Sequence, residues 1–344
     1  MRLLGKMIAL LSMSLCAEMV LGDGGDGLGM SLPQEQVQQV EDKVAAELAE
    51  CDFISVGLVY EANTIFVGSY GDQADVNAVV SYRGANPVTA TLCLQLLERG
   101  VIASLDDDIR RYSPTYADCL PDEFSETGLT FRHLLEHSSG LPRSHSDQQT
   151  PVWKNGKLNI RSVPGTAYAT SDVGYAVLED ILSDATGSTL DELLAQYVSE
   201  PIGATSFAAV SPDDPNVSGV QCTITDMTGF LAHFLNGGYI CGELIRTEAW
   251  EERLQDNKGL GWDILKEPDS DFAALAFTFA TQGQQQVYMV CQPCGRLGAV
   301  LITQKRPPYC LTSPFQLLFD LHGIAGYRHS QDKGGPHSPQ WEIP

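Results

Sequence analysis

Apolar residues recur at two different spacings along the chain, and these spacings predict its secondary structure. Residues 34–50 carry apolar side chains at intervals of three and four, which is the period of one helix face. Residues 54–60 and 64–69 are rich in β-branched and aromatic side chains, and the short stretch between them favours a hairpin turn. The first part of the chain therefore predicts one helix followed by two antiparallel strands.

The middle of the chain predicts helices, and its last third predicts strands before a closing helix. The helical ranges are residues 87–99, 131–137, 172–185, 189–198, 225–236 and 314–322, and the strand ranges are residues 273–280, 285–291 and 297–303. Thr189 and Glu192 have the spacing of a capping box at a helix start. The simplest architecture is an antiparallel sheet formed by both chain ends and flanked by helices, with a mostly helical middle lobe. The predicted fold class is therefore α+β.

Charge narrows the classes of partner. The 344 residues include 21 Lys and Arg against 44 Asp and Glu, which gives a formal net charge of −23. A chain of this charge repels phosphate backbones and anionic lipid headgroups, so we expect no nucleic-acid partner. With 43% apolar and 19% charged residues, the composition is that of a folded protein.

The chain ends have compositions of their own. Residues 1–22 combine a basic start with a short apolar run, which is typical of a signal peptide and predicts a secreted or periplasmic protein. Residues 23–33 predict a flexible mature N-terminus, residues 34–325 one domain, and residues 326–344 a disordered tail. No later run reaches 18 apolar residues, so we expect no membrane insertion.

Nine cysteines are present, and eight remain if Cys16 leaves with the signal peptide. An even number in a secreted chain permits disulfide bonds. Cys93 lies in an apolar helical run and is expected to be a buried thiol. Cys291 and Cys294 form a lone CxxC, which indicates a structural turn or a local disulfide rather than a metal or redox site.

Six stretches together resemble the serine β-lactamase-like family, which includes class C β-lactamases, DD-peptidases and related esterases. Leu129-Thr-Phe-Arg-His-Leu-Leu-Glu-His-Ser-Ser-Gly-Leu-Pro142 is the most specific match, since it is similar almost throughout to "ITIRHLLTHTSGLP". The others are residues 89–100, 104–109, 164–178, 200–207 and 259–262. The matches follow the family order from about residue 50 to 305. The resemblance implies the β-lactamase/transpeptidase-like fold.

The family's chemistry depends on a nucleophilic Ser, a Lys one turn later, a Tyr-x-Asn motif and a Lys- or His-x-Gly motif. Counted without gaps, the positions in this sequence that match these motifs are Arg83, Asn86, Thr170, Asp172, Thr281 and Gly283. Only the glycine is retained, and no lysine occurs between Lys43 and Lys154.

The replaced side chains predict a non-catalytic, pseudo-hydrolase member of the family, because loss of a nucleophile or its base alone can cost about a millionfold in kcat. The fold would then act as a binding or structural module. Two alternatives stay open: an active serine-hydrolase-type enzyme that uses other residues, and a protein that binds peptidoglycan or peptides without turnover. The expected partner is an unknown small molecule or peptide in the remnant cleft. We expect neither a cofactor nor a metal.

Arg83 and Asp172 replace the nucleophile and the amide of the family site, and the resemblance implies that these two positions converge. They could pair and plug the site, because an unpaired buried charge is costly. Alternatively, Arg83 could bind a carboxylate ligand together with backbone donors near Gln284. A plain surface arginine is the third interpretation.

Other candidate residues have structural explanations. His133 and His137 have the i, i+4 spacing of a metal pair, but the resemblance places both in a structural helix. Ser81 and Ser171 are expected to be ordinary serines, because no base is implied beside them. The acidic run of residues 106–108 is expected to cap a helix or to stay solvated rather than to bind a cation.

Overall fold

The computed structural model describes residues 31–48, 51–60, 63–71, 74–83, 86–143, 152–210, 218–235, 260–266, 273–280, 285–292 and 297–305. The chain divides into two compact units. Unit 1 comprises residues 1–80, 222–242 and 264–344, and unit 2 comprises residues 81–221 and 243–263. Each unit is described by itself.

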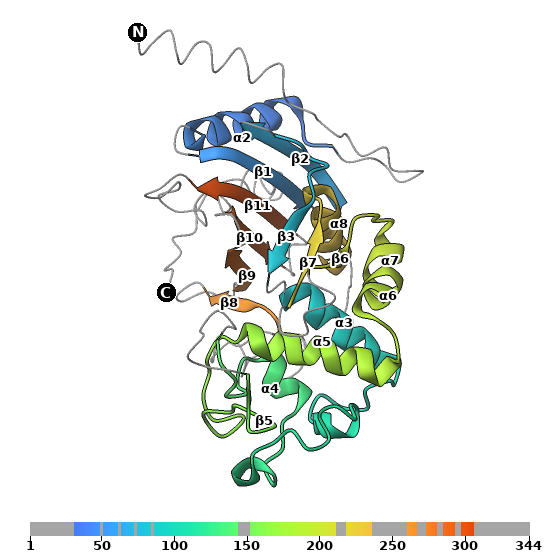
Figure 1. The fold of residues 1–344 in the computed structure, drawn as a ribbon. Helices are drawn as coiled ribbons and strands as arrows, with labels where there is room; N and C mark the ends of the chain where they lie inside the picture. Colours follow the sequence, from blue (N-terminus) through green and yellow to red (C-terminus); the bar gives the residue numbers. More distant parts are fainter. Residues whose placement is uncertain are drawn as a thin grey trace. The chain divides into compact units, whose positions relative to one another are not determined.

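Unit 1 contains a six-stranded sheet in the order β2-β1-β11-β10-β9-β8, shown in blue and orange-brown in Figure 1. Its strands are β1 (Cys51–Tyr60), β2 (Asn63–Gly71), β8 (Asp263–Lys266), β9 (Ala273–Ala280), β10 (Gln285–Gln292) and β11 (Leu297–Lys305). β1 pairs antiparallel with both β2 and β11, so that Ile54 lies opposite Thr303. The predicted α+β sheet built from both chain ends is confirmed.

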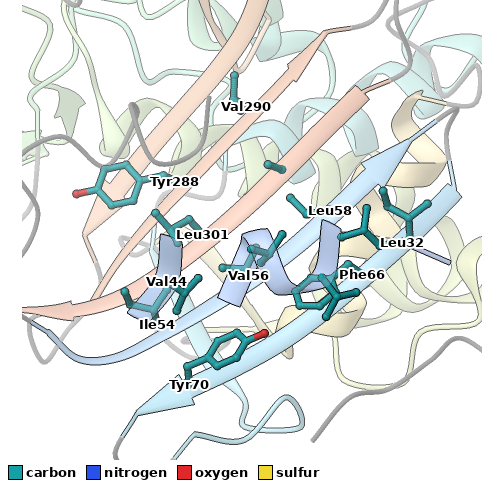
Figure 2. Close-up of a cluster of buried hydrophobic side chains, with 14 residues drawn as sticks. Leu32, Val44, Ile54, Val56, Leu58, Phe66, Tyr70, Tyr288, Val290 and Leu301 are labelled. Carbon is teal, nitrogen blue, oxygen red and sulfur yellow. The ribbon is translucent and has the colours of Figure 1, made fainter. Parts of the chain in front are cut away.

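One face of this sheet is covered by α2 (Gln34–Glu47). Alternate residues of β1, namely Ile54, Val56 and Leu58, point to the α2 side, as the period of two in a strand requires. They pack against Val40 and Val44 of the helix, and all five side chains are fully buried (Figure 2). The apolar positions that recur with the helical period in residues 34–50 thus form the face of α2 that packs against the sheet.

The opposite face carries α8 (Ile224–Leu235). A Cβ atom on Gly57 of β1 would lie only 1.8 Å from Oγ1 of Thr228, and one on Gly298 of β11 would lie 2.7 Å from Leu231. These two glycines therefore let the α8 backbone approach the sheet closely.

Unit 2 carries the remaining helices and two small sheets. Its helices are α3 (Asn86–Glu98), α4 (Phe131–Leu135), α5 (Asp172–Thr186), α6 (Leu190–Leu194) and α7 (Glu200–Ile202), with short 3-10 turns η1 (Ile109–Arg111) and η2 (Asp122–Phe124). Strands β3 (Val80–Arg83), β7 (Gly219–Cys222) and β6 (Ala208–Ala209) form one sheet, and β4 (Trp153–Lys154) and β5 (Lys157–Leu158) form a hairpin. The sequence pattern did not predict these five short strands or β8.

Between α6 and α7 the chain forms a π-helical turn, η3 (Ala195–Ser199). Pro201 has no N–H group and so cannot donate to the carbonyl of Tyr197 four residues earlier. Nε2 of Gln95, a buried residue of α3, donates to that carbonyl at 3.0 Å instead. The helix predicted for residues 189–198 is therefore confirmed, but its second half is π-helical rather than α-helical, and the Thr189–Glu192 capping box at its start is confirmed.

The cysteines whose side chains the structure describes form no disulfide, contrary to the expectation from the sequence. Cys93, Cys119, Cys222 and Cys291 are buried and form no disulfide, so the local disulfide suggested for Cys291 is wrong, whereas the buried thiol of Cys93 is confirmed. The other cysteine side chains, the predicted signal peptide, residues 314–322 and the tail lie outside the described residues. Among the described helices, none is long and apolar enough to cross a membrane.

Candidate functional site

Asn86, at the position that matches the family lysine, is the first residue of α3 and is only 3% exposed. Its side-chain amide contacts the His137 ring, with 3.1 Å between Asn Nδ2 and His Nε2. The predicted site position is therefore a buried polar contact inside unit 2.

His137 reaches this place because α4 ends at Leu135 and does not continue to residue 137 as predicted. His137 adopts a left-handed backbone conformation, with φ at 56°, and its Nδ1 accepts a hydrogen bond from the N–H of Ser171 at 3.1 Å. Burial lowers the pKa of His137 to about 4, so the ring is neutral at neutral pH.

These bonds fix the tautomer of His137. A neutral imidazole has one acceptor nitrogen, and Nδ1 already fills that role, so Nε2 carries the proton. Nε2–H needs an acceptor, and the two ends of an amide group have nearly the same shape. We therefore assign the oxygen of Asn86 to this contact, which also satisfies a buried Oδ1 that otherwise has no partner among the described groups.

Ser171 caps the start of α5 and is fully engaged. Its Oγ donates to the carbonyl of Pro142 at 2.6 Å and accepts from the N–H of Gly174 at 2.9 Å. A hydroxyl used in this way is a helix cap rather than a nucleophile, in agreement with the expectation from the sequence.

Asp172 and Thr170, which match the asparagine and tyrosine of the family's second motif, are exposed on either side of Ser171. Protein packed around the Asp172 carboxyl raises its pKa by desolvation, and the charge of Arg143 opposes this shift. The backbone N–H of Asp172 also donates to the carbonyl of Arg143 at 2.8 Å. Among the described side chains, Arg143 is thus a cation that acts on Asp172.

The Gly259-Leu-Gly-Trp262 stretch contributes a glycine to the same region. Gly261 has a φ of +78°, and a Cβ atom there would lie 2.7 Å from the carbonyl oxygen of Asn86. Its N–H donates to the carbonyl of Leu135 at 3.3 Å. Only glycine fits both the backbone conformation and the close approach to the start of α3.

The remaining candidate site residues lie, in whole or in part, outside the described residues. Arg83 ends β3, but its side chain is outside the described atoms, so its pairing with Asp172 stays a prediction. Thr281, Gly283 and Gln284 are outside the described residues.

The acidic run and the histidine pair have structural roles. The carboxylates of residues 106–108 bond to Arg132, Arg111 and Arg110 respectively, and the third also caps η1. Nδ1 of His133 accepts from the N–H of Thr130 in a capping box of α4. Within the described parts of the chain, no group of three or more His, Cys, Asp or Glu residues could hold a metal ion.

Two features of this region were not predicted from the sequence. The contact between Asn86 and His137 joins residues 51 positions apart, and Arg143 carries no motif signal. Asn86, at the motif position of the family lysine, was the signal that could have indicated such a contact, because a buried amide requires a polar partner.

Comparisons with known proteins identify the family to which the chain is similar. A family model described as "Beta-lactamase" matches residues 87–310. The D-alanyl-D-alanine-carboxypeptidase/endopeptidase AmpH of Escherichia coli K12 is 24% identical over 73% of this chain and 79% of its own length. "Beta-lactamase-like protein 4" of Dictyostelium discoideum is 31% identical over 37% of this chain and 26% of its own length.

Solved structures show the same fold. The β-lactamase/D-alanine carboxypeptidase from Yersinia pestis, complexed with citrate, has a TM-score of 0.65 at 17% identity, covering 85% of this chain and 97% of its own. The octameric penicillin-binding protein homologue from Pyrococcus abyssi has a TM-score of 0.60 at 15% identity, covering 86% of this chain and 76% of its own.

Proposed function

Because the chain belongs to the β-lactamase family, we propose that it is a pseudo-hydrolase, a member that keeps the fold as a binding module without forming an acyl-enzyme. The observation that carries the proposal is the burial of Asn86 against His137. An amide does not take up a proton at neutral pH, and this one is buried against His137, so it cannot perform the role of a lysine base.

The nearest base does not replace the missing lysine. The acceptor nitrogen of His137 is occupied by the N–H of Ser171, and burial keeps the pKa of the ring at about 4. A general base works best when its pKa lies near the operating pH. His137 is therefore a weak and inaccessible base, which argues against an active enzyme that recruits this histidine.

A peptide is the ligand class that the relatives favour. The names of the E. coli and Yersinia relatives describe carboxypeptidases that act on D-alanine-terminated substrates. A remnant site of the same fold would bind such a peptide without cutting it, with Asp172 and Arg83 at its edge. The predicted signal peptide would place the protein outside the cytoplasm, secreted or periplasmic, where such peptides occur.

Covalent labelling tests the loss of chemistry. Purified protein is incubated with a fluorescent penicillin and, separately, with a fluorophosphonate, beside the E. coli relative as positive control. We expect no labelled band and no hydrolysis of nitrocefin. Labelling that disappears when one serine is replaced by alanine would overturn the proposal and establish the alternative of an active enzyme.

Binding is tested separately with a peptide that ends in D-Ala-D-Ala, by calorimetry and by chromatography of the mixture. We expect binding that weakens in Asp172→Ala, with the peptide recovered intact. Absence of binding would argue against the peptide-binding version, and recovery of free D-alanine would contradict the non-catalytic proposal.

A further inference from the structure

A buried carboxyl group joins three elements of unit 2 away from the motif positions. Glu179 of α5 is 5% exposed, and its Oε1 accepts hydrogen bonds from Oγ1 of Thr89 at 2.7 Å and from Oγ of Ser218 at 2.8 Å. The backbone N–H of Gly219 also bonds to the carboxyl. The carboxyl therefore connects α5 to α3 and to the start of β7.

None of these donors carries a charge. Within the described residues, no Lys, Arg or His forms an ion pair with Glu179. Three neutral donors favour the ionised form, but complete burial opposes it more strongly, and the neighbouring charge of Asp180 adds to that effect. Together they raise the pKa of Glu179 to about 8.

We propose that Glu179 is a proton-linked lock. With its proton in place, the neutral carboxyl holds α3, α5 and β7 together, and loss of the proton puts an uncompensated negative charge at their junction. Because α3 begins at Asn86 and α5 begins after Ser171, this lock secures the two helices that carry the remnant motifs. The inference does not depend on the proposed function.

The sign of the effect follows from the two states. The carboxyl has its ordinary pKa of 4.5 in the unfolded chain and a raised pKa in the folded one, so the folded state holds the proton more tightly. The stabilisation is complete below about pH 4.5 and is lost as pH rises to about 8. Within this window, one linked proton changes the folding equilibrium constant about tenfold per pH unit.

Other ionisable groups also lie on α3, α5 and β7. Asp180 and Asp184, also on α5, bond to Tyr116 and Ser113, and burial raises the pKa of Asp180 only to about 6. On α3, burial raises the pKa of Cys93 far above the window. Cys222, at the end of β7, is buried and forms no disulfide. The difference between the wild type and Glu179→Gln therefore isolates the contribution of Glu179 in the interval from pH 6.5 to 8.

The test is urea unfolding of the full chain and of Glu179→Gln at pH 6.5, 7.0, 7.5 and 8.0. Gln has the shape of the protonated carboxyl and does not titrate. We expect the folding constant of the wild type to fall about tenfold per pH unit relative to that of the variant. Glu98→Gln, at an exposed carboxyl of α3, is the matched control, and it should keep the wild-type slope. Equal slopes for the wild type and Glu179→Gln would overturn the proposal.

A second measurement covers the case in which Glu179→Gln does not fold. The side-chain carboxyl carbon of Glu179 is followed by ¹³C NMR in the wild type, where we expect a titration midpoint near pH 8. Hydrogen exchange in α3 and α5 should accelerate over the same range, beyond the intrinsic pH dependence of exchange. A midpoint near pH 4.5 would show that the carboxyl is already ionised at neutral pH, and the lock would be refuted.

Discussion

At the residue scale, the contact between Asn86 and His137 determines what the start of α3 can do. The amide is buried, the imidazole is neutral, and the N–H of Ser171 fixes the ring from the other side. Replacing one member of such a buried contact leaves its partner without a hydrogen bond, so the contact resists substitution. Two consequences can be measured.

The first concerns the protonation of His137. Its pKa is lowered to about 4 in the folded protein, so the unfolded chain, with a pKa of 6.5, binds the proton more readily. Stability is therefore complete above about pH 6.5 and is lost as pH falls towards 4. In NMR titrations, the His137 ring should keep the Nε2–H tautomer and show no titration between pH 5 and 8. The same histidine in urea-unfolded protein is the reference, and a folded-state midpoint near 6.5 would contradict the prediction.

The second consequence concerns Asn86. Asn86→Leu leaves Nε2–H of His137 buried without an acceptor, and we expect a loss of about 1–3 kcal/mol in the free energy of unfolding. Asn77→Leu is the control, because Asn77 is exposed and belongs to unit 1 rather than to unit 2. Its free energy of unfolding should change by less than about 0.5 kcal/mol. Equal losses in both variants would show that the buried contact contributes nothing specific.

At the element scale, the π-helical turn at residues 195–199 depends on a side chain from another helix. The carbonyl of Tyr197, released by Pro201, is satisfied by Nε2 of Gln95. The guanidinium carbon of Arg99, the residue that follows α3, lies 4.7 Å from the centre of the Tyr197 ring. α3 and the residue after it thus support the turn through two contacts with Tyr197.

Replacement of Gln95 tests this support. Gln95→Leu has a similar volume but removes the donor to the half-buried Tyr197 carbonyl, and we expect a loss of about 1–3 kcal/mol in denaturant unfolding. Gln196→Leu makes the same change at an exposed position of the same turn and should be nearly neutral. A neutral Gln95→Leu would mean that water reaches the carbonyl and that the support is dispensable.

The observed helices and strands show which signals in the sequence were sufficient to predict an element. Periodic apolar residues located α2, α5 and every strand of the six-stranded sheet except β8 to within a few residues, because local propensity and burial agree there. They failed for β3, β6 and β7, which have two to four residues and are stabilised by their neighbours. The junction at Glu179 depends on Thr89 and Ser218, 90 and 39 residues away, and no local pattern encodes such a meeting.

At the scale of the whole molecule, the main sheet depends on strands from both ends of the chain. β11 lies between β1 and β10, so its removal separates the N-terminal hairpin from the C-terminal strands. A chain that ends at residue 296 should show no cooperative unfolding transition and no protection of β1 amides from hydrogen exchange. A chain that ends at residue 325 lacks only the predicted tail and should unfold like the full-length protein. Cooperative unfolding of the shorter chain would contradict this prediction.

The pairing of Ile54 with Thr303 also has a consequence for synthesis. The partners are roughly 250 residues apart, and translation at 5–20 residues per second separates their emergence by roughly 12 to 50 seconds. During this delay the inner edge of β1 has no partner, although the hairpin with β2 can already form. An unpaired strand edge of this kind invites pairing with other chains. The nascent protein is therefore most exposed to aggregation while its N-terminal hairpin waits for the last strands to be made.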